Sequence, residues 1–287
     1  MANERFFVRD RFEENDLPYF EADGKVGLLA TVSPEGLPHV TLITAMQATD
    51  PRHLIFGQFC EGRGKRYAEA NHSVGFLFMS LDKRLWRGTA RWTGKADSGP
   101  EHELMNRKPM WRYNSYFGIH TVHYLDLVSV TPAQRLSMGA VIRGVLSAAL
   151  SKGRFAGAGV GNGPERALNP WSQAFISRPG NLKFVSYVGE DGYPRVIPQF
   201  AATCADGRRI FLPGVEYAEE LTLIPEGASV AVFTMSLDME DVLARGAFRR
   251  ASSGGVITVD WVYNSMPPVA ERIYPPTDLA EKVLEFR

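Results

Sequence analysis

The sequence predicts a mainly β fold with peripheral helices (α+β), in which one antiparallel unit occurs twice. Short apolar runs separated by turn residues follow one another near the N-terminus, which is typical of an antiparallel meander. The same pattern recurs about half a chain later, in register and without a gap. Apolar residues make up 45% and charged residues 22% of the 287 residues, as in a folded domain with a sizeable core.

The first three strands are expected at residues 26–33, 38–46 and 53–59, where the chain is apolar. Pro34-Glu35-Gly36 separates the first two runs, and Ala48-Thr49-Asp50-Pro51 separates the last two. Both separators are turn-forming sequences. We therefore expect a three-stranded meander.

The remaining elements of the unit follow from periodicity. VGFLFM is apolar throughout, as in a strand buried on both faces. Trp86 and Trp92 lie on one face of an alternating run, which is the period of a strand. We expect strands at 73–80, 85–93 and 120–130, and short helices at 66–71 and 101–106.

The repeat is a shift of 156 residues. Adding 156 carries Val32, Gly36 and Pro38 onto Val188, Gly192 and Pro194, and Met79-Ser80-Leu81-Asp82 onto Met235-Ser236-Leu237-Asp238. A shift of 150 also aligns the W-x-Y-N-S motif at 111–115 with 261–265. Register held across several turns indicates an internal duplication.

Three parts are expected. The first repeat covers residues 1–132, a linker covers 133–168, and the second repeat covers 169–287. The linker begins as an amphipathic helix at 132–151 and continues as a glycine-rich segment at 152–164. Because Asn162 stands where G-x-G-x-x-G needs its last glycine, we interpret this segment as flexible rather than as a dinucleotide loop.

Composition narrows the class of protein. The formal net charge is zero, so no global field attracts nucleic acid or anionic lipid. No apolar run approaches the roughly 20 residues of a membrane span, and we expect a cytoplasmic protein.

Cys60 and Cys204 form no C-x-x-C pair, which argues against a disulfide framework and a zinc site. His120 and His123, three apart on a strand, point to opposite faces, so no metal is expected.

A cationic, glycine-rich turn follows the third run. It reads Glu61-Gly62-Arg63-Gly64-Lys65-Arg66 and precedes a helix. Backbone N–H groups at a helix start, together with fixed positive charge, can hold a phosphate. The second repeat has Glu219, Glu220 and Leu221 at the positions of Arg63, Gly64 and Lys65. The reversal of charge predicts a phosphate site in the first repeat only.

These residues resemble the pyridoxamine 5'-phosphate oxidase-like family of FMN-binding split barrels. The resemblance rests on Leu29-Ala30-Thr31, Gly36, Pro38-His39-Val40-Thr41, and Arg63 with Lys65 ahead of Asn71. It implies two tandem six-stranded split β-barrels that form an intrachain pseudo-dimer. It also implies that the first repeat holds FMN at the groove between the repeats, and that the second repeat is a degenerate copy.

The resemblance implies a set of cofactor contacts. The strand at 39–44 lies beside the isoalloxazine ring, Gln58 and Phe59 line the ring edge, and the cationic turn grips the phosphate. Trp86 closes the far side, and either Trp261, Tyr263 and Asn264 or Trp111 and Tyr113 complete the groove. The residues expected at the cofactor are His39, Val40, Thr41, Leu42, Ile43, Gln58, Phe59, Arg63, Gly64, Lys65 and Trp86.

The function implied is that of an FMN-dependent oxidoreductase, a flavoprotein in which FMN carries the electrons. No catalytic side chain is expected. The vitamin B6 signature is not recognisable after Thr121, so the substrate or electron donor is an unidentified small molecule. Three alternatives stay open: a non-catalytic flavin or haem binding protein, a deazaflavin in place of FMN, and a homodimer of such chains.

Overall fold

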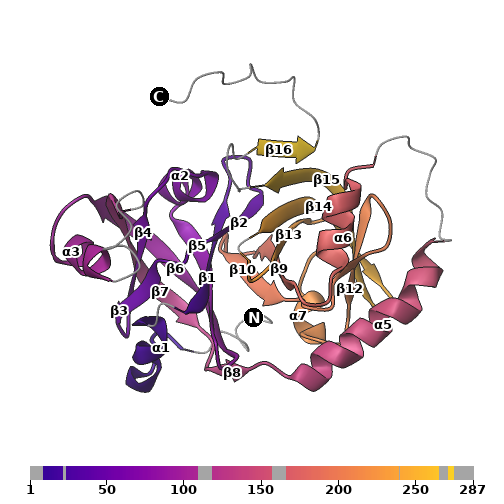
Figure 1. Cartoon of the computed structure of the whole chain (residues 1–287), viewed down its shortest axis with the longest axis horizontal. Coiled ribbons are helices and arrows are strands. Elements are labelled where there is room, and N and C mark those ends of the chain that lie inside the picture. The colour runs from indigo at the N-terminus through magenta and orange to yellow at the C-terminus, as the bar shows by residue number, and fades with distance from the viewer. Residues whose placement is uncertain are drawn as a thin grey trace, which may run out of the picture. The chain divides into compact units, whose positions relative to one another are not determined.

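The computed structural model describes residues 9–21, 24–108, 118–156, 166–238, 240–264 and 271–274 (Figure 1). For residues 150–156 and 271–274 it describes the backbone alone. The chain divides into two compact units, Met1–Met138 with Val185–Ile197, and Gly139–Phe184 with Pro198–Arg287. This division follows contacts in space, so the repeat boundaries expected at residues 132 and 168 stay a prediction.

One antiparallel sheet accounts for the strands of the first repeat, coloured indigo to magenta in Figure 1. Its strand order is β2-β1-β5-β6-β7-β4-β3, with β8 paired to β6. The strands are β1 (Lys25–Val32), β2 (Pro38–Leu42), β3 (Met46–Asp50), β4 (His53–Gln58), β5 (Ser73–Ser80), β6 (Arg84–Ala96), β7 (Thr121–Val130) and β8 (Gln134–Arg135).

The expectation of one strand over 38–46 is wrong, because the chain leaves one edge of the sheet at residues 43–45 and joins the other. The N–H of Ile43 donates to Gly27 O at 2.8 Å, and the N–H of Gly57 donates to Ala45 O at 2.9 Å. These bonds attach the crossing segment to β1 and to β4, so the sheet closes as a split barrel. A Cβ on Gly27 would lie 2.5 Å from Ile43 O, which explains the glycine there.

Aromatic side chains fill the barrel. Phe12 and Phe20, from the segment before β1, pack with Phe76, Phe78 and Trp86 in one core cluster. A second cluster lies where Met105 packs beside strand residues such as Ile55 and Val122. The helical elements of this repeat are η2 (Glu14–Asp16), α1 (Leu17–Glu21), α2 (Arg63–Ala70) and α3 (Pro100–Arg107).

The second sheet has the same topology as the first. Its order is β10-β9-β13-β14-β15-β12-β11, with β16 paired to β15, so the predicted tandem fold is confirmed. Each sheet has eight described strands and not the six expected. Shifting β2 by 156 residues gives the bounds of β10. The strands are β9 (Leu182–Val188), β10 (Pro194–Pro198), β11 (Thr203–Cys204), β12 (Arg209–Pro213), β13 (Ser229–Met235), β14 (Asp241–Ala251), β15 (Gly254–Asn264) and β16 (Glu271–Tyr274).

The expected match of the two W-x-Y-N-S motifs is not a structural equivalence. Arg245 pairs with Trp261 in the second sheet as Thr89 pairs with Ser129 in the first, so β15 corresponds to β7 at a shift of 132. Trp261 is therefore the counterpart of Ser129. The shift changes because the first repeat carries α3 between β6 and β7, whereas β14 turns directly into β15. Residues 111–115 lie outside the described part of the chain.

The helix that follows β8 in the chain begins and ends later than expected. Helix α5 runs over Met138–Ala156, later than 132–151, because β8 uses the residues before it. The first part of the expected flexible segment is thus helical, and 157–164 lie outside the described residues. The other helices are α6 (Pro170–Ser177) and α7 (Ala218–Leu221). Across the described ranges, we find no helix with the length and apolar character needed to cross a bilayer.

Candidate functional site

The cationic turn forms the N-terminus of α2, which begins at Arg63 and not at residue 66 as expected. Gly62 is the extended N-cap residue and supplies no side-chain cap. The first intrahelical bond runs from Arg66 N to Gly62 O at 3.4 Å. The preceding N–H groups, including those of Gly64 and Lys65, therefore have no partner within the helix. The positive end of the helix dipole coincides with cationic side chains.

Gly64 seats this helix start against β2. A Cβ at Gly64 would lie 2.2 Å from Thr41 Oγ1 and 3.7 Å from His39 Cδ2, so a larger residue requires a shift of strand or helix. Thr41 Oγ1 is buried and makes no hydrogen bond to any described residue. His39 is buried and meets the Tyr67 ring edge-on at 5.4 Å between centroids. The structure thus brings His39, Thr41 and Gly64 together.

Lys65 is a buried side chain that bonds to another residue of the turn. Its side chain is only 6% exposed, and Nζ donates to Cys60 O at 2.6 Å. Nζ also lies 5.7 Å from the centre of the Phe59 ring. Burial lowers the pKa of Lys65, with Cys60 and Glu61 opposing the shift. Lys65 therefore holds the turn in shape, while Arg63 is the half-exposed cation at the first position of the helix.

Strand β2 presents a backbone edge beside this helix start. In the described sheet, β2 pairs with β1 alone, so its other edge has no strand neighbour. The side chains of Val40 and Ile43 are buried in packing, whereas Leu42 is half-buried. Any contact these two buried residues make with a ligand beside β2 is therefore through backbone N–H and C=O groups.

Two of the expected cofactor residues point elsewhere. Trp86 is 1% exposed and packs in the core, with its ring 4.9 Å from that of Phe20. The Gln58 side chain points to the inner face of the barrel, where Oε1 lies 2.6 Å from His123 Nε2. Neither side chain joins the cluster of β2 and α2. Periodicity could not distinguish these orientations, because both faces of these strands are buried.

A polar network around His123 was not expected from the sequence. Trp92 Nε1 donates to His123 Nδ1 at 3.1 Å, which leaves His123 Nε2–H as the donor to Gln58 Oε1. The imidazole stacks on Phe56 with 4.5 Å between centroids and 5° between planes. Burial lowers the pKa of His123 to about 4; Glu69 opposes this shift, and Lys95 and Lys65 add to it. The sequence held one indication of this network: His123 and Leu125 are two residues apart on a strand, so both side chains lie on the same, buried face.

The second repeat lacks both features. The helix position of Arg63 is occupied by Glu219, which is exposed, and the position of His123 is occupied by Gly255. A Cβ on Gly255 would lie 2.2 Å from Cε2 of Phe248, and Phe248 stands at the position of Trp92. An aromatic ring therefore occupies the space of the polar network. The asymmetry between the repeats extends beyond the charge reversal seen in the sequence.

The other expected residues fall into three groups. Trp261 and Tyr263 stack on each other in β15 at 5.5 Å, and Asn264 ends that strand. Trp111 and Tyr113 lie outside the described residues. His123 is buried and His120 is exposed, as the spacing predicted. No group of three metal-ligating side chains occurs in the described ranges.

The protonation of His123 should make the stability of the fold depend on pH. Folded His123 stays neutral down to about pH 4, while the unfolded chain takes up a proton near pH 6.5. The unfolded state binds more protons in this window, so the free energy of unfolding should fall as pH drops from 6.5 to 4, by roughly 3 kcal/mol. Urea unfolding at pH 7 and pH 4.5 measures this change in the free energy of unfolding.

The control for this prediction is His123→Gln, which removes the titrating group. Asp50 and Asp206, whose pKa values are lowered by hydrogen bonds and nearby cations against burial, weaken both proteins equally in acid. The difference between the two proteins therefore isolates His123. If both proteins lost the same free energy of unfolding between pH 7 and pH 4.5, His123 would not be the group that makes stability depend on pH.

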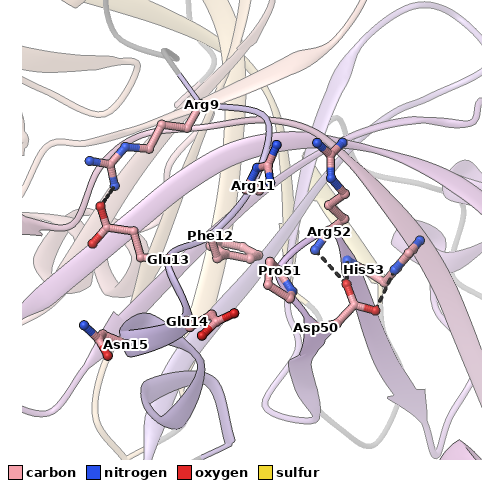
Figure 2. A pocket seen from close by; sticks show the side chains of 10 residues that line it. All are labelled: Arg9, Arg11, Phe12, Glu13, Glu14, Asn15, Asp50, Pro51, Arg52 and His53. Carbon is pink, nitrogen blue, oxygen red and sulfur yellow. Dashed lines mark hydrogen bonds and ion pairs between the residues drawn. The ribbon is translucent and has the colours of Figure 1, made fainter.

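A cavity of about 800 Å³ opens elsewhere in the first unit (Figure 2). Its charges pair with each other, since Arg9 binds Glu13 at 2.6 Å and His53 binds Asp50 at 2.7 Å. None of the expected cofactor residues lines it, and its balanced charge gives no reason to place an anion there. The lining residues are Arg9, Arg11, Phe12, Glu13, Glu14, Asn15, Asp50, Pro51, Arg52 and His53.

The topology and the site together define a pair of β-barrels, one of which carries a cationic, uncapped helix start against an edge strand. No family model and no curated protein matches the chain. Among solved structures, the chain is similar to HupZ from Group A Streptococcus, at 14% identity over 42% of this chain and 91% of that one, with a TM-score of 0.35.

Two further solved structures are similar to part of the chain. An FMN-binding protein from Syntrophomonas wolfei subsp. wolfei has 14% identity over 43% of this chain and 87% of its own, with a TM-score of 0.37. An F420 reductase has 17% identity over 42% of this chain and 98% of its own, with a TM-score of 0.34.

Proposed function

We propose that the first repeat binds FMN, with the phosphate at the start of α2, and that the protein is an FMN-dependent oxidoreductase. The observation that carries the proposal is the uncapped, cationic helix start that Gly64 allows to sit against Thr41. Helix N-termini with exposed N–H groups are favourable sites for phosphate. The counterpart in the second repeat carries Glu219 and would repel one.

The donors available at this site suit a phosphate ester. Backbone N–H groups of the first helical turn and the Arg63 guanidinium donate, and Thr41 Oγ1 is a buried hydroxyl without a partner among described residues. A phosphate oxygen accepting from that hydroxyl would satisfy it. Lys65 contributes positive charge at longer range while it holds Cys60 O.

The isoalloxazine would lie along β2. The edge of β2 that faces away from β1 has no strand neighbour in the described sheet and offers backbone groups to a ligand. Phe59, 38% exposed, offers an aromatic surface next to the turn. Trp86 and Gln58 are left out of the proposed site, because their side chains face the barrel interior. When bound, FMN supplies the electron or hydride transfer to a small-molecule partner. The chain supplies binding, orientation and partial exclusion of water.

The absorption spectrum of the protein, after reconstitution with FMN and removal of free flavin, tests this proposal. We expect one flavin per chain, with a spectrum that dithionite bleaches and air restores. A colourless protein would contradict FMN binding. A Soret band after expression, with no flavin retained, would favour the haem binding alternative, and flavin that no reductant reaches would favour a non-catalytic binder.

A further inference from the structure

The second repeat buries a lysine that has no counterpart in the first. Lys183 on β9 is 1% exposed, and its equivalent in the first repeat is Gly27. Its Nζ donates to Arg178 O at 2.8 Å and to Phe200 O at 3.0 Å. An ammonium group has three N–H donors, so these two carbonyls leave one donor over.

The charge of Lys183 is not compensated by an ion pair. No described carboxylate lies within salt-bridge distance of Nζ. Glu216 acts on it only at longer range, and burial raises the pKa of Glu216 to about 6. Burial lowers the pKa of Lys183 to about 8, with Cys204 and Glu216 opposing the shift. A buried cation without an ion-pair partner is costly, and an anion beside it would remove most of that cost.

A cavity of about 160 Å³ lies next to this lysine, between helix α5 and the segment that follows β10. Lys183 is the one charged side chain among its lining residues, and Ser177 and Thr203 add hydroxyl groups. The remaining walls are apolar and include Ala148 of α5. The full lining is Val145, Ala148, Ala149, Ser177, Pro179, Lys183, Phe200, Ala201, Ala202 and Thr203.

The size of the cavity limits the ligand. An apolar protein cavity of roughly 150 Å³ accommodates benzene, which has six heavy atoms. Hence the space beside Lys183 admits a compound of about that size. Apolar walls with a single cationic side chain among them match an alkyl group with a single anionic head.

We propose that this cavity binds a small monocarboxylate of about six heavy atoms, whose carboxylate pairs with the Lys183 ammonium. The alkyl part of the ligand contacts Val145, Ala148 and Phe200. The second repeat is then a second binding site with its own chemistry rather than an empty copy. This inference concerns residues of the second unit alone and does not depend on FMN binding to the first.

Calorimetric titration of the full chain with butyrate, at constant ionic strength set with chloride, tests the proposal. Butyramide has the same size and shape without the charge and serves as the matched ligand. We expect butyrate to bind at least about tenfold more tightly than butyramide, which is the scale of one charge-assisted hydrogen bond. Equal binding of the two ligands, or no binding of butyrate, would overturn the proposal.

Two variants locate the site. Lys183→Met keeps the length of the side chain and removes its charge, and we expect the preference for butyrate over butyramide to vanish. Ala148→Phe fills the cavity from α5 while leaving Lys183 in place, and we expect it to abolish binding of both ligands. Butyrate binding that survives both substitutions would place the site elsewhere. If Lys183→Met fails to fold, the comparison of butyrate with butyramide in the unmodified chain still tests whether the cavity prefers a carboxylate.

Discussion

Arg63→Glu is expected to weaken FMN binding by at least about 100-fold. Arg63 stands at the first position of α2, and reversing its charge replaces a phosphate donor with a repelling carboxylate. Charge-assisted hydrogen bonds contribute about 1.5–3 kcal/mol each, and repulsion adds to that loss. Fluorescence quenching of FMN on titration with protein measures the dissociation constant.

The matched control is Glu219→Arg, the opposite change at the equivalent position of the second repeat. Glu219 is exposed, so this substitution should leave FMN affinity and the urea unfolding midpoint unchanged. Arg63→Glu is preferred over a change at Lys65, since a carboxylate at that buried position would destabilise the turn itself. An Arg63→Glu protein that keeps its affinity for FMN would place the phosphate elsewhere.

Gly64→Ala is expected to destabilise the first barrel by about 1–3 kcal/mol, the usual cost of overpacking. The added Cβ would lie 2.2 Å from Thr41 Oγ1, so α2 and β2 must move apart. Alanine favours helices over glycine by about 1 kcal/mol, so a loss of stability here opposes the intrinsic propensity. We expect FMN binding to fall with it, because the helix start no longer sits against the strand.

Gly62→Ala is the control on the same turn, since a Cβ there meets no atom within 4 Å. Because alanine is a poorer N-cap residue than glycine, Gly62→Ala should cost about 0.5 kcal/mol, less than Gly64→Ala. Adding Thr41→Ala to Gly64→Ala removes the clashing hydroxyl and should restore part of the lost stability. If Gly64→Ala and Gly62→Ala proved equally mild by urea unfolding, the close approach of helix and strand would not be what Gly64 serves.

The sequence was sufficient for the tandem β architecture, because turn residues and apolar runs recur in fixed register. It was not sufficient for the crossing at residues 43–45, where an unbroken apolar run conceals a change of sheet edge. That crossing depends on Gly27, a residue distant in sequence. The shared W-x-Y-N-S motif misled for a related reason, since α3 shifts the register of β7 relative to β15 and only strand pairing shows it.

The candidate site was predicted in part. Local sequence was enough for the cationic helix start, and comparison of the repeats distinguished Arg63 from Glu219. The roles of Gln58 and Trp86 depend on which face of a doubly buried strand each side chain takes, and alternation carries no such information when both faces are apolar. The burial of Lys183 and the cavity beside it could not be predicted, because both arise from tertiary packing of segments far apart in the sequence.

The affinity of the unmodified chain for FMN compared with riboflavin tests the central claim most directly. The two ligands share the isoalloxazine ring and differ by the phosphate, so the difference reports what the helix start of α2 contributes. We predict that FMN binds at least about 100-fold more tightly, or roughly 2.7 kcal/mol, and that Arg63→Glu abolishes the difference. Equal affinity for FMN and riboflavin would contradict a phosphate site at α2.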